Sequence, residues 1–237
     1  MKQLIIDAMG DSALLIQFGE NIDESTNSLV QAAAFRLEQH PFPGFQECVP
    51  SFTTLTVYYD PLHLNQPADG GTAFEFVRTI VAGLLQNMET VPATERETIE
   101  IPVCYGGEYG PDLAYVAEAN GLDEEDVIKI HTGQDLLVYA LGFAPGFPYL
   151  GGIPESIAAP RKTTPRLRIP AGSIGIAGTQ TGIYPLETPG GWQIIGRTPL
   201  ALFRPDQDPP VLLKSGQWIR FKAVSFSEYT RLAGGRK

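Results

Sequence analysis

Hydrophobic residues recur with two different periods along the chain, and the period changes near its middle. In the first half, apolar side chains return every three to four positions in two segments. The pattern predicts one helix capped by Asn21 or Asp23 and ending near Gln39, and a second over about 72–89. Four segments have the alternating or apolar pattern of strands: residues 12–18, 45–49, 53–59 and 98–103. Residues 1–93 are therefore expected to form an α+β domain, an antiparallel sheet with two helices.

In the second half the apolar pattern becomes short and two-fold. Two short helices, split by Asn120-Gly121, are expected within residues 111–131. Six strands are expected after them, at residues 136–141, 174–177, 182–186, 192–196, 200–203 and 218–224. Short strands separated by glycine and proline are typical of an all-β barrel or sandwich, so residues 94–237 are expected to form a barrel domain.

Glycine and proline concentrate in residues 142–199, where they fill 20 of 58 positions, against 25 of the other 179. Average use of the two together is about 12%. Apolar residues recur throughout this stretch, so it is able to bury a core rather than remain disordered. Shaped loops on a rigid scaffold are a common place for a site, and we look for the functional site here.

Charge divides the chain in the same way. Residues 1–141 carry 5 basic and 22 acidic side chains, a net −17, whereas residues 142–237 carry 12 and 5, a net +7. The overall net charge of −10 argues against nucleic acid as a partner. The basic part suits an anionic small molecule or an acidic protein surface, and an uneven but merely solvated charge distribution is the alternative.

Several classes of site lack their sequence signals. No apolar run approaches the roughly 18–20 residues of a membrane span, and Cys48 and Cys104 are expected to be reduced core thiols, so we expect a cytoplasmic location. There is no phosphate-binding loop, dinucleotide fingerprint or nucleophile elbow. No metal site is expected, because the three histidines are isolated; His131 is expected at a helix C-terminus, where a cation is favoured.

What remains is recognition chemistry. Arg161, Lys162, Arg166 and Arg168 lie within eight residues with no acid among them, and the arginine fork matches a carboxylate or phosphate. A solvated loop is the alternative. From residue type we expect anion binding by Arg161 and Arg168, and polar recognition by Gln180 and Tyr184. The expected pocket wall consists of Gly190, Gly191 and Trp192, for which a turn with a core tryptophan is the alternative.

Three long blocks now identify a resemblance. They are GFAPGFPYLGG (142–152), APRKTTPRLRIPAGSIGIAGTQTGIYP (159–185) and TPGGWQIIGRTP (188–199), and GDSALLIQFGENID (10–23) and EIPVCYGGEYGPDL (100–113) agree with them. The chain resembles the family called allophanate hydrolase subunit 1 over nearly its whole length. The resemblance implies an α+β domain followed by a cyclophilin-like β-barrel.

The resemblance also implies a function. Stand-alone bacterial members of the family act with a C subunit, related to allophanate hydrolase subunit 2, and with an A subunit to open the lactam of 5-oxoproline to glutamate. The reaction is coupled to ATP, which is expected at the level of the complex. Other members inhibit a sporulation sensor histidine kinase, and here the loop with Phe143, Pro145, Phe147 and Tyr149 would supply exposed aromatic anchors. A role in urea or allophanate breakdown is the third alternative.

Overall fold

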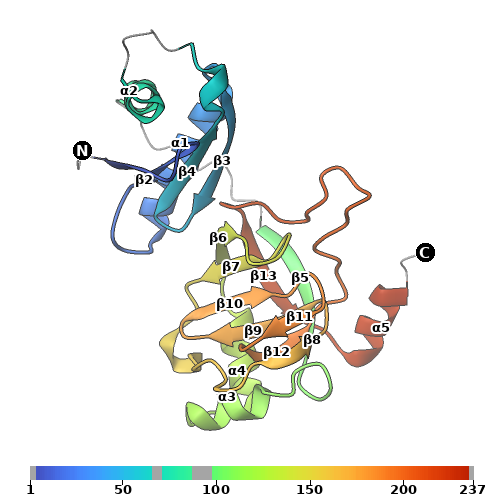
Figure 1. The fold of residues 1–237 in the computed structure, drawn as a ribbon. Coiled ribbons are helices and arrows are strands. Elements are labelled where there is room, and N and C mark those ends of the chain that lie inside the picture. Colours follow the sequence, from blue (N-terminus) through green and yellow to red (C-terminus); the bar gives the residue numbers. More distant parts are fainter. Residues whose placement is uncertain (1–3, 66–70, 87–97, 235–237) are drawn as a thin grey trace. The chain divides into compact units, whose positions relative to one another are not determined.

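The structure, a computed structural model, describes residues 4–65, 71–86 and 98–234. Contacts divide the chain into two units, Met1–Glu95 and Arg96–Lys237, and Figure 1 shows the elements of each. The domain boundary expected between residues 93 and 94 falls among residues 87–97, outside the described residues.

The sheet of the N-terminal unit has four antiparallel strands in the order β1-β2-β4-β3. Their bounds are Ile5–Ala8 (β1), Ala13–Gln17 (β2), Phe45–Ser51 (β3) and Thr54–Tyr59 (β4). The alternation seen in the sequence decides which face is buried, because Leu55, Val57 and Tyr59 of β4 all lie in the core. Strand β1 has no counterpart in the expected elements.

Two helices complete this unit, as the apolar period predicts. Helix α1 (Glu24–Gln39) begins at Asp23, whose carboxylate accepts the Thr26 amide at 2.8 Å. Helix α2 (Ala73–Leu85) begins with a reciprocal capping box between Thr72 and Glu75. Their apolar faces join the sheet in one core. A short 3-10 turn, η1 (Pro61–His63), follows β4.

The second unit is a closed barrel of seven strands. Their order is β6-β13-β5-β12-β9-β10-β7, and β7 pairs back with β6 to close the barrel. Only β13 and β5 run parallel among these pairs. The bounds are Thr98–Tyr105 (β5), Leu136–Leu141 (β6), Pro148–Gly151 (β7), Ser173–Ala177 (β9), Gln180–Ile183 (β10), Gln193–Arg197 (β12) and Trp218–Ala223 (β13). The expected barrel is confirmed.

A second, two-stranded sheet lies outside the barrel order. It pairs β8 (Arg166–Ile169) with β11 (Thr188–Gly190), and neither strand was expected, because each is short and contains or adjoins proline. The strand expected at residues 200–203 is wrong. Phe203 there makes only an isolated bridge to Val211, in a segment bounded by Pro199 and Pro205, which donate no backbone hydrogen bond.

Three helices and a 3-10 turn belong to the barrel unit. Helices α3 (Leu113–Ala119) and α4 (Glu124–Thr132) flank Asn120-Gly121 as expected, and Figure 1 places both at one end of the barrel. The turn η2 (Glu155–Ile157) follows β7. Helix α5 (Phe226–Gly234) buries no residue, although Tyr229 packs against Tyr109 with ring centroids 4.4 Å apart. Over the described ranges, no helix is long and apolar enough to cross a membrane.

Candidate functional site

Aromatic rings cover glycines on the outer face of the barrel wall. Gly182 of β10 and Gly175 of β9 are register partners, and their neighbours in sequence point into the barrel core. A Cβ at Gly182 would come within 2.8 Å of the Phe147 ring, and one at Gly175 within 2.9 Å of Trp192. These glycines allow the rings to lie directly on the sheet, so part of the Gly-rich stretch serves close packing.

The rings form a small cluster of their own, separate from the barrel core. Phe147 is at its centre, with ring centroids 5.2 Å from Tyr184 and 5.5 Å from Trp192, both in edge-to-face geometry. Phe147, Tyr184 and Trp192 are 2%, 2% and 6% exposed. The exposed anchor expected at Phe147 is therefore wrong, because the glycine-lined wall takes that ring up.

Phe143 is the exposed ring of this loop. The residue is 62% exposed, and its φ of 68° is unusual for a bulky residue. Pro145 is also exposed, and the two help to line a recess of about 370 Å³ with Val211 and their loop neighbours. Tyr149, by contrast, is half-buried and packs 4.9 Å from Phe147.

Arg161 lies at the edge of the aromatic cluster, with its guanidinium carbon 6.0 Å from the centre of the Trp192 ring. It is exposed, and no acidic side chain of the described residues forms an ion pair with it. Burial raises the pKa of Tyr184 to about 12, against the opposing effects of the Trp192 backbone amide and the Arg161 charge. Burial also raises the pKa of Tyr149, which Arg161 opposes. Both phenols are therefore protonated at neutral pH. The Arg161 guanidinium lies near both of them.

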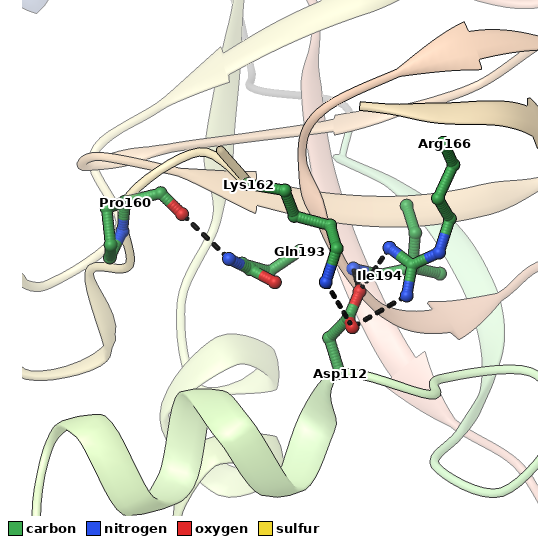
Figure 2. A network of polar contacts seen from close by, with 6 residues as sticks. All are labelled: Asp112, Pro160, Lys162, Arg166, Gln193 and Ile194. Atoms are coloured by element: carbon green, nitrogen blue, oxygen red, sulfur yellow. Dashed lines mark hydrogen bonds and ion pairs between the residues drawn. The ribbon is translucent and has the colours of Figure 1, made fainter. Parts of the chain in front are cut away.

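Two further basic residues of the expected cluster, Lys162 and Arg166, face an acid that comes from far away in the sequence. Arg166 forms a bidentate pair with Asp112, with both N–O distances 2.7 Å, and Lys162 Nζ lies 3.3 Å from the same carboxylate (Figure 2). The backbone amide of Ile194 donates to it at 2.7 Å. Burial alone would raise the pKa of Asp112, but the Arg166 and Ile194 hydrogen bonds and the two positive charges hold that pKa below its ordinary value.

The same region holds the backbone on both sides of Arg161. The Gln193 amide donates to the Pro160 carbonyl at 2.9 Å, which Figure 2 also shows. The Lys162 amide donates to the Gly191 carbonyl at 2.7 Å. Arg161 therefore has a hydrogen-bonded residue before and after it, and Trp192 lies between the two residues that make these bonds.

The structure brings most of the expected site residues together. Gly190 lies under Tyr184, where a Cβ would come within 2.5 Å of the hydroxyl oxygen, and Gly191 contacts the 160–166 loop. Arg168 is separate from this group, with its side chain 82% exposed and 3.8 Å from Glu187. Gln180 is half-buried on the outer face of β10, opposite Gly151. Among the described residues, neither Arg168 nor Gln180 forms a hydrogen bond or ring contact with Arg161.

Two residues of the site were missed in the sequence. Asp112 and Gln193 fix the Arg161 loop, yet Asp112 pairs with a residue 54 positions away. Its one local signal was its place directly before a helix, where aspartate ordinarily caps the first turn; here the side chain makes no cap hydrogen bond.

A second polar network lies inside the barrel. The Thr181 hydroxyl donates to the Gly175 carbonyl at 2.9 Å, so it accepts from His131 Nε2 at 3.0 Å. His131 Nδ1 then accepts the Tyr105 hydroxyl at 2.8 Å. Burial lowers the pKa of His131 to about 3, so the cation expected at the end of its helix is wrong. Within the described ranges, no group of three or more histidine, cysteine or acidic side chains is placed to hold a metal ion.

Comparisons with known proteins extend over nearly the whole chain. Residues 4–213 match the family described as carboxyltransferase domain, subdomain C and D. The B subunit of 5-oxoprolinase from Bacillus subtilis is 54% identical over 226 residues, 94% of each chain. The protein of the same name from Escherichia coli O157:H7 is 41% identical, over 90% of this chain and 93% of its own.

Longer proteins contain a similar unit. The urea amidolyase of Lachancea kluyveri is 26% identical over 94% of this chain, which spans only 13% of that protein. Among solved structures, TTHA0988 is 37% identical and superposes with a TM-score of 0.76. The match covers 90% of this chain, which spans 40% of the length of TTHA0988.

Proposed function

The chain belongs to the family of carboxyltransferase subdomains C and D, and we propose that it is the B subunit of an ATP-dependent 5-oxoprolinase. The observation that supports this proposal is identity of 54% and 41%, over at least nine-tenths of both chains, to proteins named as the B subunit of 5-oxoprolinase. The reaction opens the lactam of 5-oxoproline to glutamate, and it takes place in the cytoplasm. Both cysteines are free and buried, in keeping with that compartment.

The protein works within a complex rather than alone. Its similarity to short parts of TTHA0988 and of urea amidolyase supports this, because related units occur within much longer chains. We propose two partners, an A subunit together with a C subunit of the allophanate hydrolase subunit 2 family, with ATP bound at the level of the complex. The chain contributes an α+β domain and a cyclophilin-like barrel domain to this assembly.

Arg161 and its surroundings form the part of the substrate site that this chain supplies. 5-Oxoproline carries one carboxylate, which is ionised at neutral pH, and Arg161 is an exposed cation beside two protonated phenols, Tyr149 and Tyr184. The arginine fork binds a carboxylate with two parallel hydrogen bonds. Trp192 and Gly190–Gly191 form the wall against which the ring of the substrate packs.

The chemical difficulty of the reaction is the resonance of the lactam amide. Transfer of the ATP γ-phosphoryl group to the lactam oxygen releases ADP and leaves a ring carbon that water attacks more readily. The first water adds to this carbon, the C–N bond breaks and the nitrogen takes up a proton, which gives γ-glutamyl phosphate. A second water hydrolyses this acyl phosphate to glutamate and inorganic phosphate. In this scheme the chain positions the substrate and stabilises negative charge on it. No group of this chain is assigned to the phosphoryl transfer itself.

Reconstitution tests the proposal. The purified A and C subunits are assayed for 5-oxoproline-dependent ATP hydrolysis with and without this chain. We expect turnover to fall to the background of ATP hydrolysis when the chain is left out. Undiminished turnover without it would falsify the assignment.

A docking role is a second candidate, favoured by the exposure and backbone conformation of Phe143. Phe143 is 62% exposed and lines the recess of about 370 Å³, as an anchor for a protein partner would. The partner would be a sensor histidine kinase or another member of the complex. Loss of kinase binding in a folded Phe143→Ala variant would support the kinase role, and absence of binding by the unmodified chain would exclude it. A urea or allophanate role has weaker support, at 26% identity.

A further inference from the structure

We propose that Asp112 is a positioning residue of the substrate site, which fixes the 160–166 loop so that Arg161 stays over Trp192 and is ready to bind a carboxylate. This inference rests on the function proposed above and deepens it. Asp112 lies behind the loop and does not touch the substrate. It acts through Lys162 and Arg166 on Arg161, the residue that binds the substrate.

The carboxylate of Asp112 is itself held rigidly. The backbone amide of Asp112 donates to the Ile194 carbonyl at 2.8 Å, and the Ile194 amide donates to the Asp112 carboxylate at 2.7 Å. Asp112 is 5% exposed. A buried acceptor fixed to β12 in this way offers a fixed point for the loop rather than one more mobile surface charge.

The loop meets this fixed point after Arg161, and β12 holds it separately before Arg161. Lys162 follows Arg161 directly, and Arg166 binds Asp112 with two parallel bonds of 2.7 Å. Before Arg161, the Pro160 carbonyl accepts the Gln193 side chain. If Asp112 released its two partners, the loop would keep the hydrogen bonds from Gln193 to Pro160 and from Lys162 to Gly191, and the pairing of Arg166 with Gly190 in the β8–β11 sheet.

The ring that Arg161 covers belongs to Trp192, which directly precedes β12 and lies in the same segment as the groups that hold the loop. Gly191 and Gln193 hold the residues on either side of Arg161, Trp192 lies between them, and Ile194 holds Asp112. A change in the Asp112 pair therefore displaces Arg161 relative to its own aromatic neighbour. Such displacements weaken binding of a substrate that needs a defined fork geometry.

The network also sets the charge that the site presents. Two cations of the loop face the Asp112 carboxylate, with side chains only 30% and 28% exposed. Arg161 is the remaining cation of residues 160–166, and it faces outward. One outward guanidinium suits a monoanionic carboxylate better than a multiply charged phosphate, which ordinarily attracts several cations.

Hydrogen exchange on the full chain tests the positioning step without any assay of activity. The amide of Lys162 reports on the loop, because it donates to the Gly191 carbonyl. We expect Asp112→Asn and the milder Arg166→Lys, which keeps the charge but loses the fork, to speed its exchange about tenfold. Asp135→Asn is the matched control, because it breaks an Arg220 pair of equal length, 2.7 Å, in the same unit. Unchanged exchange in folded Asp112→Asn and Arg166→Lys chains overturns the proposal.

A double-mutant cycle in the reconstituted complex tests the link to substrate. We expect Asp112→Asn to raise the KM for 5-oxoproline about tenfold with kcat within about twofold, and Asp135→Asn to change neither. In an Arg161→Gln background, Asp112→Asn is expected to add nothing further, because it acts through Arg161. Full additivity of the two substitutions would show a merely structural effect and overturn the proposal.

The proposed function and the positioning role of Asp112 fail in different ways. If wild-type turnover does not depend on this chain, the proposed function fails, and the carboxylate role of the loop fails with it. If turnover depends on the chain and Arg161→Gln raises KM, but Asp112→Asn and Arg166→Lys leave KM unchanged, only the positioning role of Asp112 is wrong.

Discussion

The barrel unit holds two polar networks that differ in charge and in what they reach. The inner one joins Tyr105, His131 and Thr181, is neutral, and ends on a backbone carbonyl inside the barrel. The outer one joins Asp112 to Lys162 and Arg166, is charged, and lies directly behind a loop whose Arg161 is exposed.

From this difference we infer that the inner network serves the fold and that the outer one serves the proposed site. In the inner network each donor has an acceptor in one protonation state, and His131 stacks 4.5 Å from Phe221 of the barrel. Both His131 and Thr181 are fully buried. The outer network holds Lys162, the residue next to the exposed cation Arg161, and we propose that it positions this cation. Substitutions in the inner network should therefore change stability alone, and those in the outer one should also change substrate binding.

The largest effect on stability is expected from Asp112→Ala. The substitution leaves Arg166, Lys162 and the Ile194 amide without their acceptor, and breaking a buried pair in this way lowers the free energy of unfolding by about 3 kcal/mol. Urea denaturation at neutral pH measures it. Asp135→Ala is the comparison, because its Arg220 partner is 51% exposed and its loss is expected to lower that free energy by under about 1 kcal/mol. Equal effects would contradict the distinction.

Acid is expected to weaken the inner network first. The pKa of His131 is about 3 in the folded chain and about 6.5 when unfolded, so between these values the unfolded state binds one proton more. The free energy of unfolding therefore falls as pH falls below 6.5, by about 1.4 kcal/mol per pH unit, or about 2 kcal/mol at pH 5.

Urea titrations of wild type and His131→Gln from pH 6.5 to 5 measure this dependence. Asp112 has a lowered pKa, so it stays ionised throughout that window, and its own contribution is lost only at lower pH. The pH dependence should be smaller in His131→Gln by the amount due to one histidine. The same slope in both chains would mean that His131 is not the group responsible.

Thr181→Val is expected to have a smaller effect. It removes the acceptor of His131 Nε2–H and the donor to the Gly175 carbonyl at nearly constant volume, which destabilises the fold by about 1–2 kcal/mol. The KM for 5-oxoproline should not change, because this network lies inside the barrel. A raised KM in a folded Thr181→Val chain would contradict the claim that the inner network affects stability alone.

Arg168→Gln is expected to have the smallest effect. Arg168 and Glu187 are 82% and 58% exposed and 3.8 Å apart, so the pair contributes under about 0.5 kcal/mol to stability. Because Arg168 lies apart from the aromatic cluster, its substitution should raise KM less than Arg161→Gln does. Steady-state kinetics of the two variants side by side measures this, and a larger effect of Arg168→Gln would extend the site along β8.

Local periodicity predicted much of the fold. The helices that became α1, α3 and α4 and the strands that became β2, β4, β6 and β9 follow apolar patterns contained within a few residues. Prediction failed where tertiary partners decide. Strands β8 and β11 form only by pairing with each other, and residues 200–203 have an apolar strand pattern without a ladder partner. His131 was misjudged because its burial depends on strands that are far apart in the sequence, β5, β10 and β13.

The site was predictable as a region but not as a geometry. Composition pointed to residues 142–199, and Arg161, Tyr184 and Trp192 do lie together there. The run of four cations misled, because the acid that pairs with two of them comes from before α3. Phe147 misled as well, since Gly182 on the neighbouring strand β10 allows its ring to be buried.

The central claim is that Arg161 binds the substrate of a complex that needs this chain. The most direct measurement is the KM for 5-oxoproline of the reconstituted complex with Arg161→Gln, beside Arg220→Gln as a control arginine that is also exposed. We expect Arg161→Gln to raise KM about tenfold or more, with kcat within about threefold and the free energy of unfolding unchanged. An unchanged KM in a folded, assembled Arg161→Gln complex would contradict the claim.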